Sequence, residues 1–135
     1  MYTSETKVRV RYSETDRMGY VYYGNYASYF EVARVEALRD LGMPYLRMEE
    51  EGFLLPVLDY KVRYFKPAFY DDLLSIKTKI VQLPTVRITF NYEIFGEDGL
   101  KRNEAETTLV FINKESGKPC KAPDELLEKL KPYFS

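Results

Sequence analysis

The sequence predicts an α+β fold in which a curved antiparallel sheet of about five strands wraps around one long helix. Apolar residues recur every three to four positions between residues 25 and 41, which is the helical period, and at every second position in the segments that follow. Because short turns join the later segments, neighbouring strands must run antiparallel. One face of the sheet must then cover the apolar helix.

The predicted elements follow one another without a linker or a repeat. Alternating residues 6–12 indicate a first strand, and residues 13–24 form a glycine-bearing loop. Asn25 is the predicted N-cap of a largely buried helix that runs to about Leu41 and ends at Gly42. The remaining predicted segments are a short helical piece at 44–51, strands at 53–65 (interrupted by Pro56), 72–82, 86–95 and 101–113, a hairpin turn at 96–99, and an amphipathic helix at 123–132.

The composition excludes several classes of function. The chain of 135 residues suits a single domain, 1–135, and its net charge of -1 gives no electrostatic reason to expect nucleic acid or an anionic membrane as a partner. It contains no histidine, which excludes mechanisms built on an imidazole base or a histidine-bound zinc. We therefore expect neither a metal nor a cofactor. The one cysteine, Cys120, is best explained as an incidental thiol.

The sequence also bears on location. It has no apolar run long enough for a membrane span, and residues 1–7 lack the apolar core of a signal peptide. A single cysteine allows no internal disulfide, which fits a reducing compartment. We expect a cytoplasmic protein.

The residues that could take part in a reaction are concentrated in the segment 12–34. One carboxylate, Asp16, lies in the glycine-bearing loop that leads into the predicted helix. The first N–H groups of a helix have no partner within it and carry the positive end of the helix dipole, so they can stabilise an oxyanion. A carboxylate beside them can attack a carbonyl or activate water. The alternative is that Asp16 is a turn residue that bonds local N–H groups, which loop chemistry alone favours.

The same segment resembles the signature of the hot-dog-fold acyl-CoA thioesterases of the 4-hydroxybenzoyl-CoA thioesterase type. The matching residues are Tyr12, Glu14-Thr15-Asp16, Gly19, Val21-Tyr22, Asn25-Tyr26 and Glu31-Val-Ala-Arg34, followed by Pro67-Ala68 and Asp71-Asp72-Leu73. The resemblance extends over essentially the whole chain. It implies a hot-dog fold and the hydrolysis of an acyl thioester to free acid and CoA.

The resemblance also implies the site residues. Asp16 would be the nucleophile or the general base, and a backbone N–H at Tyr23 or Gly24 would be the oxyanion donor. Many bacterial relatives carry histidine at the position of Tyr23, whereas the 4-hydroxybenzoyl-CoA branch has tyrosine there. Tyr12 would either point its hydroxyl into the site or serve as a core aromatic, and Glu14 is expected to be an exposed charge at a strand end rather than a second site carboxylate.

Further residues are predicted to bind the substrate, an acyl-CoA or an acyl-carrier-protein thioester. They are Asn25, Val57, Lys61, Arg63 and Lys66. The three basic residues would meet the phosphates of CoA, although solvated strand charges are the commoner explanation of such a cluster.

The resemblance implies an assembly as well: a homodimer with sheets joined edge to edge, often doubled to a homotetramer. Asp16 of one chain would then face residues 57–65 of its partner at the subunit boundary. Open sheet edges and the 13 tyrosines agree with this assembly. The alternative function is a non-catalytic acyl-CoA-binding or regulatory hot-dog protein, since the dehydratases of this fold generally rely on a histidine.

Overall fold

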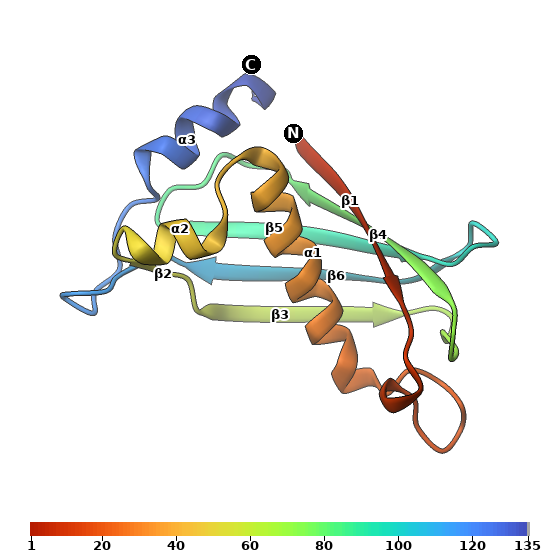
Figure 1. Cartoon of the computed structure of the whole chain (residues 1–135). Helices are drawn as coiled ribbons and strands as arrows, with labels where there is room; N and C mark the ends of the chain where they lie inside the picture. The colour runs from red at the N-terminus through yellow and green to blue at the C-terminus, as the bar shows by residue number, and fades with distance from the viewer. Residues whose placement is uncertain (135) are drawn as a thin grey trace.

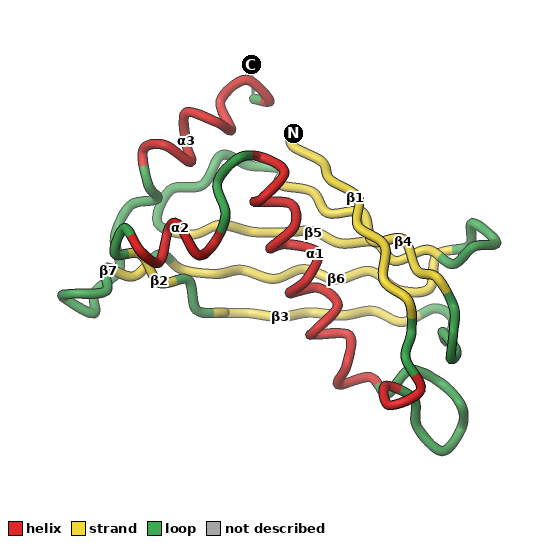
Figure 2. Tube along the Cα trace, in the orientation of Figure 1, coloured by secondary structure: helices red, strands yellow, loops and turns green. Residues whose placement is uncertain are grey.

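The computed structural model describes residues 1–134 of the chain. Five strands form one antiparallel sheet in the order β1-β4-β5-β6-β3, and a long helix, α1 (Tyr26–Leu41), crosses one face of it (Figures 1 and 2). This is the α+β arrangement that the sequence predicts. The strands are β1 (Tyr2–Arg9), β3 (Val57–Tyr64), β4 (Leu73–Ile80), β5 (Arg87–Phe95) and β6 (Lys101–Val110).

The core lies between α1 and the sheet. Phe30, Ala33 and Ala37 of α1 are fully buried, and the two alanines let the helix backbone approach the strands closely. The strands contribute every second side chain to this layer, as the alternation predicts. The buried strand residues are Tyr2, Leu74, Ile76, Thr78, Ile80, Ile88, Phe90, Tyr92, Ile94, Asn103, Ala105, Thr107 and Leu109.

Smaller elements close the two ends of this core. Helix α1 ends at Gly42, whose φ of 91° is the left-handed conformation expected of a helix C-cap. The remaining elements are the helices α2 (Tyr45–Glu50) and α3 (Asp124–Leu130), the short pair β2 (Phe53–Leu54) and β7 (Ile112–Asn113), and 3₁₀ turns at Tyr12–Glu14, Tyr23–Asn25 and Lys131–Tyr133. No helix within residues 1–134 combines the length and the apolar character that crossing a membrane requires.

Three predicted boundaries are wrong. The first strand begins at Tyr2 and ends at Arg9, because its whole length pairs with β4, with Tyr2 opposite Ile80. The predicted strand 53–65 is two strands in different sheets, separated at Pro56, which has no N–H to donate to a ladder. The predicted strand 101–113 likewise divides into β6 and β7.

One side of the molecule remains open. Strands β1 and β3 are the two edges of the sheet, and all residues of β3 except the half-buried Val62 are exposed. Helix α1 is also less buried than predicted, because Val32 is 45% exposed. An unpaired strand with apolar side chains is a surface on which another chain can pair.

Candidate active site

The loop that carries Asp16 is a small, hydrogen-bonded hairpin. The N–H of Asp16 donates to the carbonyl of Tyr20 at 2.8 Å, and Gly19 closes the turn at a φ of 83°, a conformation that favours glycine. Oδ1 of Asp16 accepts hydrogen bonds from the N–H groups of Met18 at 2.9 Å and Tyr20 at 3.2 Å. Oδ2 accepts none from residues 1–134. The turn therefore fixes the carboxylate and leaves one oxygen available.

The 3₁₀ turn Tyr23–Asn25, which leads directly into α1, offers backbone N–H donors. Within the described residues, the N–H groups of Tyr23 and Gly24 donate to no acceptor. Gly24 leaves space for the ring of Tyr22, since a Cβ at residue 24 would lie 2.7 Å from Cε2 of that ring. Two unpaired N–H groups at the positive end of a helix can bind a developing oxyanion.

Asn25 has a different role from the one predicted. It occupies the N-cap position, but its φ of -77° and ψ of -18° are helical and its side chain makes no capping bond. Its Nδ2 instead donates to the carbonyl oxygen of Glu14 at 2.9 Å. Asn25 therefore ties the helix start to the beginning of the loop.

A cavity of about 320 Å³ opens between the Asp16 loop and the end of β3. Three predicted site residues, Asp16, Tyr23 and Lys66, line it together. The other lining residues are mostly aromatic or apolar: Met18, Tyr20, Val21, Tyr26, Tyr64, Phe65 and Pro67. Such a lining can enclose an apolar group while a carboxylate and an ammonium group reach its polar end.

Two tyrosines of this cavity, Tyr26 and Tyr64, act as neutral groups. Burial raises the pKa of Tyr26 to about 12. Burial, and to a lesser degree the neighbouring Tyr23, also raises the pKa of Tyr64. At neutral pH these two hydroxyls remain protonated. Asp16 is the one Asp or Glu side chain that lines the cavity within residues 1–134.

Two other predicted residues lie away from the cavity. Tyr12 is 76% exposed and packs its ring against Tyr70, with the centroids 5.6 Å apart, so it belongs neither to the core nor to the cavity lining. Val57 begins β3, whereas the cavity lies at the other end of that strand, at Tyr64. A single chain does not bring these residues together with Asp16.

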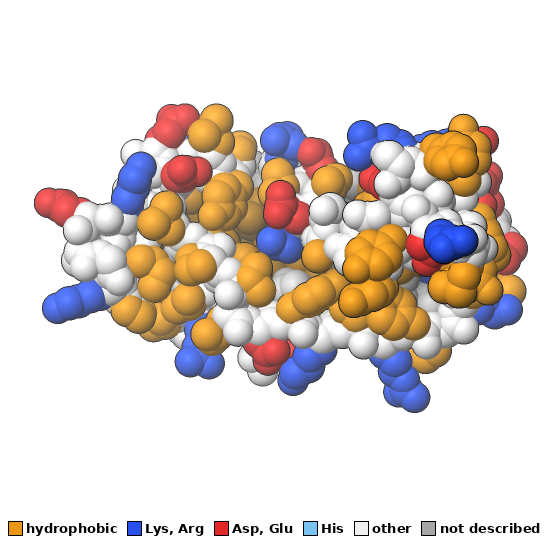
Figure 3. All heavy atoms as spheres, turned by 90° about the horizontal axis from the view of Figure 1, so that it is seen from below, with side chains coloured by type: hydrophobic (Ala, Val, Ile, Leu, Met, Phe, Trp, Pro, Cys, Tyr) orange, Lys and Arg blue, Asp and Glu red, His pale blue; other side chains and the backbone are white. Residues whose placement is uncertain are grey.

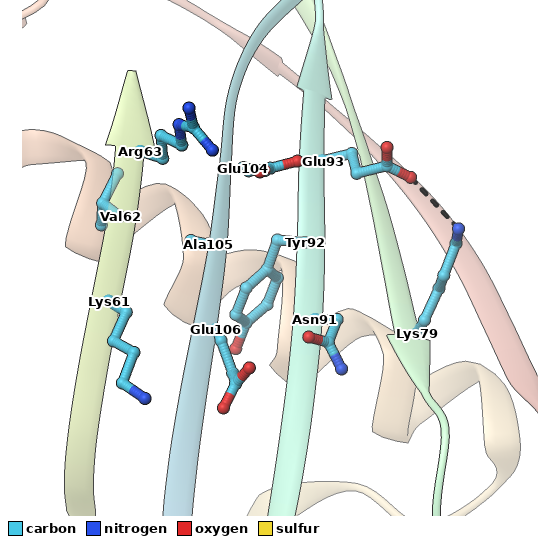
Figure 4. Close-up of a pocket in the computed structure, with 10 residues that line it drawn as sticks. All are labelled: Lys61, Val62, Arg63, Lys79, Asn91, Tyr92, Glu93, Glu104, Ala105 and Glu106. Atoms are coloured by element: carbon cyan, nitrogen blue, oxygen red, sulfur yellow. Dashed lines mark ion pairs between the residues drawn. The ribbon is translucent and has the colours of Figure 1, made fainter. Parts of the chain in front are cut away.

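Lys61 and Arg63 lie on the sheet face opposite α1. Figure 4 shows them beside Glu104 and Glu106 of β6, in a hollow of about 470 Å³. Alternation along β3 explains their position, because Val62 between them is directed toward the helix side. This hollow is larger than the Asp16 cavity, but it has no helix terminus and its lining is mostly charged, whereas that of the Asp16 cavity is mostly aromatic or apolar. We therefore take the Asp16 cavity as the candidate active site.

Comparison with known proteins identifies the family. Residues 10–130 match the family model described as the thioesterase-like superfamily. The chain belongs to this superfamily. It is 32% identical over 124 residues to the acyl-CoA thioester hydrolase YbgC of Escherichia coli O6:H1, covering 92% of each chain.

Two solved structures agree with this fold. The structure of a DHNA-CoA thioesterase from Staphylococcus aureus superposes with a TM-score of 0.86 at 38% identity, covering 99% of this chain and 85% of that one. A protein from Thermus thermophilus superposes with a TM-score of 0.90 at 30% identity, covering 96% and 98%. The predicted hot-dog fold and the predicted family are thus confirmed.

The environment of one residue near the candidate site, Glu14, differs from the one that the sequence predicts. Glu14 was expected to be an exposed charge, but its side chain is only 12% exposed. It bonds the N–H of Arg11 three residues before it and the hydroxyl of Tyr29 on α1. The spacing of Arg11 and Glu14 is that of a capping box, which was the available signal for the first of these contacts.

Proposed function

We propose that this chain is an acyl-CoA thioesterase, which hydrolyses an acyl thioester to the free acid and CoA. The observation that carries the proposal is that Asp16 and Tyr23, at the start of α1, line one largely apolar cavity. The named activities of relatives such as the acyl-CoA thioester hydrolase YbgC support it. Asp16, Tyr23 and Gly24 are the proposed catalytic residues.

Two chemical routes are open to Asp16. In one, a carboxylate oxygen bonds to the thioester carbon, the C–S bond breaks, and water hydrolyses the resulting mixed anhydride. In the other, Asp16 takes a proton from water while the water oxygen forms the new C–O bond and the C–S bond breaks. In both, the N–H groups of Tyr23 and Gly24 stabilise the oxyanion. The thiolate of CoA is a good leaving group, which agrees with a chain without histidine.

We propose that Lys66 contributes to binding of the carrier. Its ammonium group lies at the cavity, where it can meet an anionic carrier, CoA or acyl-carrier protein. The acyl group would occupy the aromatic part of the lining. Asn25 supports the helix start through the bond from its Nδ2 to Glu14, which uses one of the two N–H groups of that amide, and its proposed part in substrate binding stays a prediction.

We also propose that a second copy of the chain completes the site. Figure 3 views the molecule from the side of β3 and the Asp16 loop, and hydrophobic side chains run across this face. The unpaired edge and exposed residues of β3, including Leu58 at 52%, favour a partner that continues the sheet. In such a homodimer, or in a homotetramer built from it, Val57, Lys61 and Arg63 of one chain would approach Asp16 of the other. The proposed location is cytoplasmic.

A binding-only protein is the second candidate. The observation that favours it is that Asp16 bonds the N–H groups of Met18 and Tyr20, as a plain turn residue does. Such a protein would keep the cavity and bind acyl-CoA without turning it over.

The decisive experiment compares Asp16→Asn with Asp98→Asn on a panel of aromatic, short, branched and long acyl-CoAs. Asp98 is a matched control, since its Oδ1 also accepts a backbone N–H two residues ahead, from Leu100 at 3.0 Å. We expect Asp16→Asn to lower turnover by at least about 100-fold while Asp98→Asn leaves it nearly unchanged.

Other outcomes have equally clear meanings. A folded Asp16→Asn protein with near-wild-type turnover would remove Asp16 from the mechanism. If the wild type turns over no thioester but binds acyl-CoA in calorimetry, the binding-only candidate is correct.

A further inference from the structure

Glu14 is a half-buried carboxylate two residues before Asp16 that the proposed mechanism does not use. Oε1 accepts hydrogen bonds from the N–H of Arg11 at 2.7 Å and from the hydroxyl of Tyr29 at 2.8 Å. Oε2 accepts from Nη2 of Arg11 at 3.1 Å and from its Nε at 3.3 Å. Both oxygens are therefore engaged, one of them by a side chain of α1.

The main chain of Glu14 makes further contacts. Its carbonyl oxygen accepts hydrogen bonds from the N–H of Tyr22 at 2.8 Å and from Nδ2 of Asn25 at 2.9 Å. Tyr22 ends the Asp16 hairpin and Asn25 begins the helix. One residue thus joins the start of the loop, the end of the loop and the start of α1.

Tyr29, the donor in the contact with Oε1 of Glu14, is held in place by packing. Its side chain is buried and its ring packs edge-on against Tyr26, with the centroids 5.7 Å apart. Burial, followed by the hydrogen bond to Glu14, raises the pKa of Tyr29, so the hydroxyl remains a donor at any physiological pH. The carboxylate of Glu14 is in this way attached to a side chain that does not move independently of α1.

These contacts attach the Asp16 hairpin to the helix start. The hairpin of residues 15–21 is held together by its own bonds, such as that between Asp16 and Tyr20, and forms one structural unit. It is also attached to the segment before β4, where the N–H of Val21 donates to the carbonyl of Ala68 at 2.8 Å, so the contacts of Glu14 set its position on the helix side. A short displacement of this unit would change the distance from Asp16 to the N–H groups of Tyr23 and Gly24. Misplacement of a reacting group by about 1 Å can lower a rate by about 100-fold.

We infer that Glu14 and Tyr29 are a positioning pair that holds Asp16 against the start of α1, an inference that rests on the proposed function. Neither residue lines the cavity, so neither touches the substrate. They act through Asp16.

The experiment compares Tyr29→Phe with Tyr2→Phe. The control removes the same kind of buried hydroxyl, since Tyr2 donates to the carbonyl of Ala37 at 2.6 Å near the far end of α1. We expect Tyr29→Phe to lower kcat by about tenfold to 100-fold with KM changed less than about twofold. Tyr2→Phe should lower the melting temperature comparably and keep kcat within about twofold of wild type. Glu14→Gln, which retains one acceptor oxygen, should lower kcat in the same direction.

The same changes are then made in the Asp16→Asn background. Because the pair acts through Asp16, Tyr29→Phe should lower the residual rate of that background by less than about twofold. The inference is overturned if Tyr29→Phe lowers the rate equally in the wild-type and Asp16→Asn backgrounds. It is also overturned if Tyr29→Phe and Glu14→Gln have the same kcat as Tyr2→Phe. Either result leaves the proposed function intact. Full turnover by Asp16→Asn alone would instead overturn the proposed role of Asp16, and the inference with it.

Discussion

The ring of Phe30, in the second turn of α1, lies against the ring of Tyr92 on β5, with their centroids 4.7 Å apart. Both residues are almost completely buried. This contact joins the helix to the centre of the sheet, and the hydroxyl of Tyr92 is bonded in turn to Oγ1 of Thr107 at 2.7 Å. The stability of the helix–sheet layer should therefore depend strongly on Phe30.

Phe30→Ala is expected to lower the free energy of unfolding by about 3–5 kcal/mol, because it leaves a cavity in a closely packed layer. Urea unfolding at one fixed protein concentration measures this change. Leu46→Ala is the control, since Leu46 is exposed on α2, and should change the stability by less than about 0.5 kcal/mol. Equal losses in the two variants would show that the layer is not packed as described.

The pH dependence of stability should reveal the contacts of Glu14. Burial of this carboxyl opposes its ionisation, but the N–H of Arg11, the hydroxyl of Tyr29 and the Arg11 guanidinium outweigh burial and lower its pKa below the ordinary 4.5. A carboxyl whose pKa is lowered on folding stabilises the fold above about pH 4.5, and that stabilisation is lost as pH falls through the folded-state pKa.

Glu14→Gln should consequently lose less stability than wild type between pH 6 and about pH 3. Urea unfolding across this pH interval measures the difference. Glu93 and Asp98 also have lowered pKa values, but their contributions to the pH dependence cancel in the comparison because both proteins keep these residues. Parallel stability curves for the two proteins would contradict the expectation.

Lys66 should act on binding rather than on turnover. Removal of its charge in Lys66→Ala is expected to raise KM for acyl-CoA by about two- to fivefold with kcat nearly unchanged, because exposed charge pairs contribute little. The difference should shrink as salt is added. Lys118→Ala, which removes an exposed charge in the loop after β7, should not change KM. A fall in kcat at constant KM would assign Lys66 a role in the reaction itself.

The open side of the sheet should be the assembly surface. In sedimentation at low micromolar concentration, the wild type is expected to be a dimer or a tetramer, and Leu58→Glu on β3 should shift it toward monomer. A buried charge opposes association across an apolar edge. Leu46→Glu, on α2, should leave the assembly unchanged. An active wild-type monomer would rule out a site shared between two chains.

Local pattern was sufficient to predict most of the fold. Helix α1 was placed correctly because apolar periodicity and Gly42 mark its length. Strand β5 was found within one residue at each end and β4 within two, because their inward residues alternate without interruption. The start of β1 was missed because Thr3, Ser4, Glu5 and Thr6 have no apolar alternation, and only the pairing with β4 extends that strand to Tyr2.

The candidate site was predictable only in part, although Lys66, far from Asp16 in sequence, was among the predicted residues that line the cavity. Asp16 and Tyr23 are close along the chain, and both line the cavity. The burial of Glu14 could not be read from the sequence, because its partner Tyr29 is fifteen residues away and reaches it only after the loop folds back. The direction of Lys61 and Arg63 was predictable, since residues that alternate with Val62 must lie on the opposite face.

The residues around the cavity fall into two groups with different freedom to vary. Val21 and Tyr26 are buried in the core, so changing them disturbs the whole domain. Met18, Tyr20 and Phe65 line the same cavity from exposed positions and carry little of the core packing. Substitutions at these three positions can reshape the cavity at small cost in stability. The acceptance of different acyl groups is thus separable from folding, and related chains can diverge in substrate while retaining one architecture.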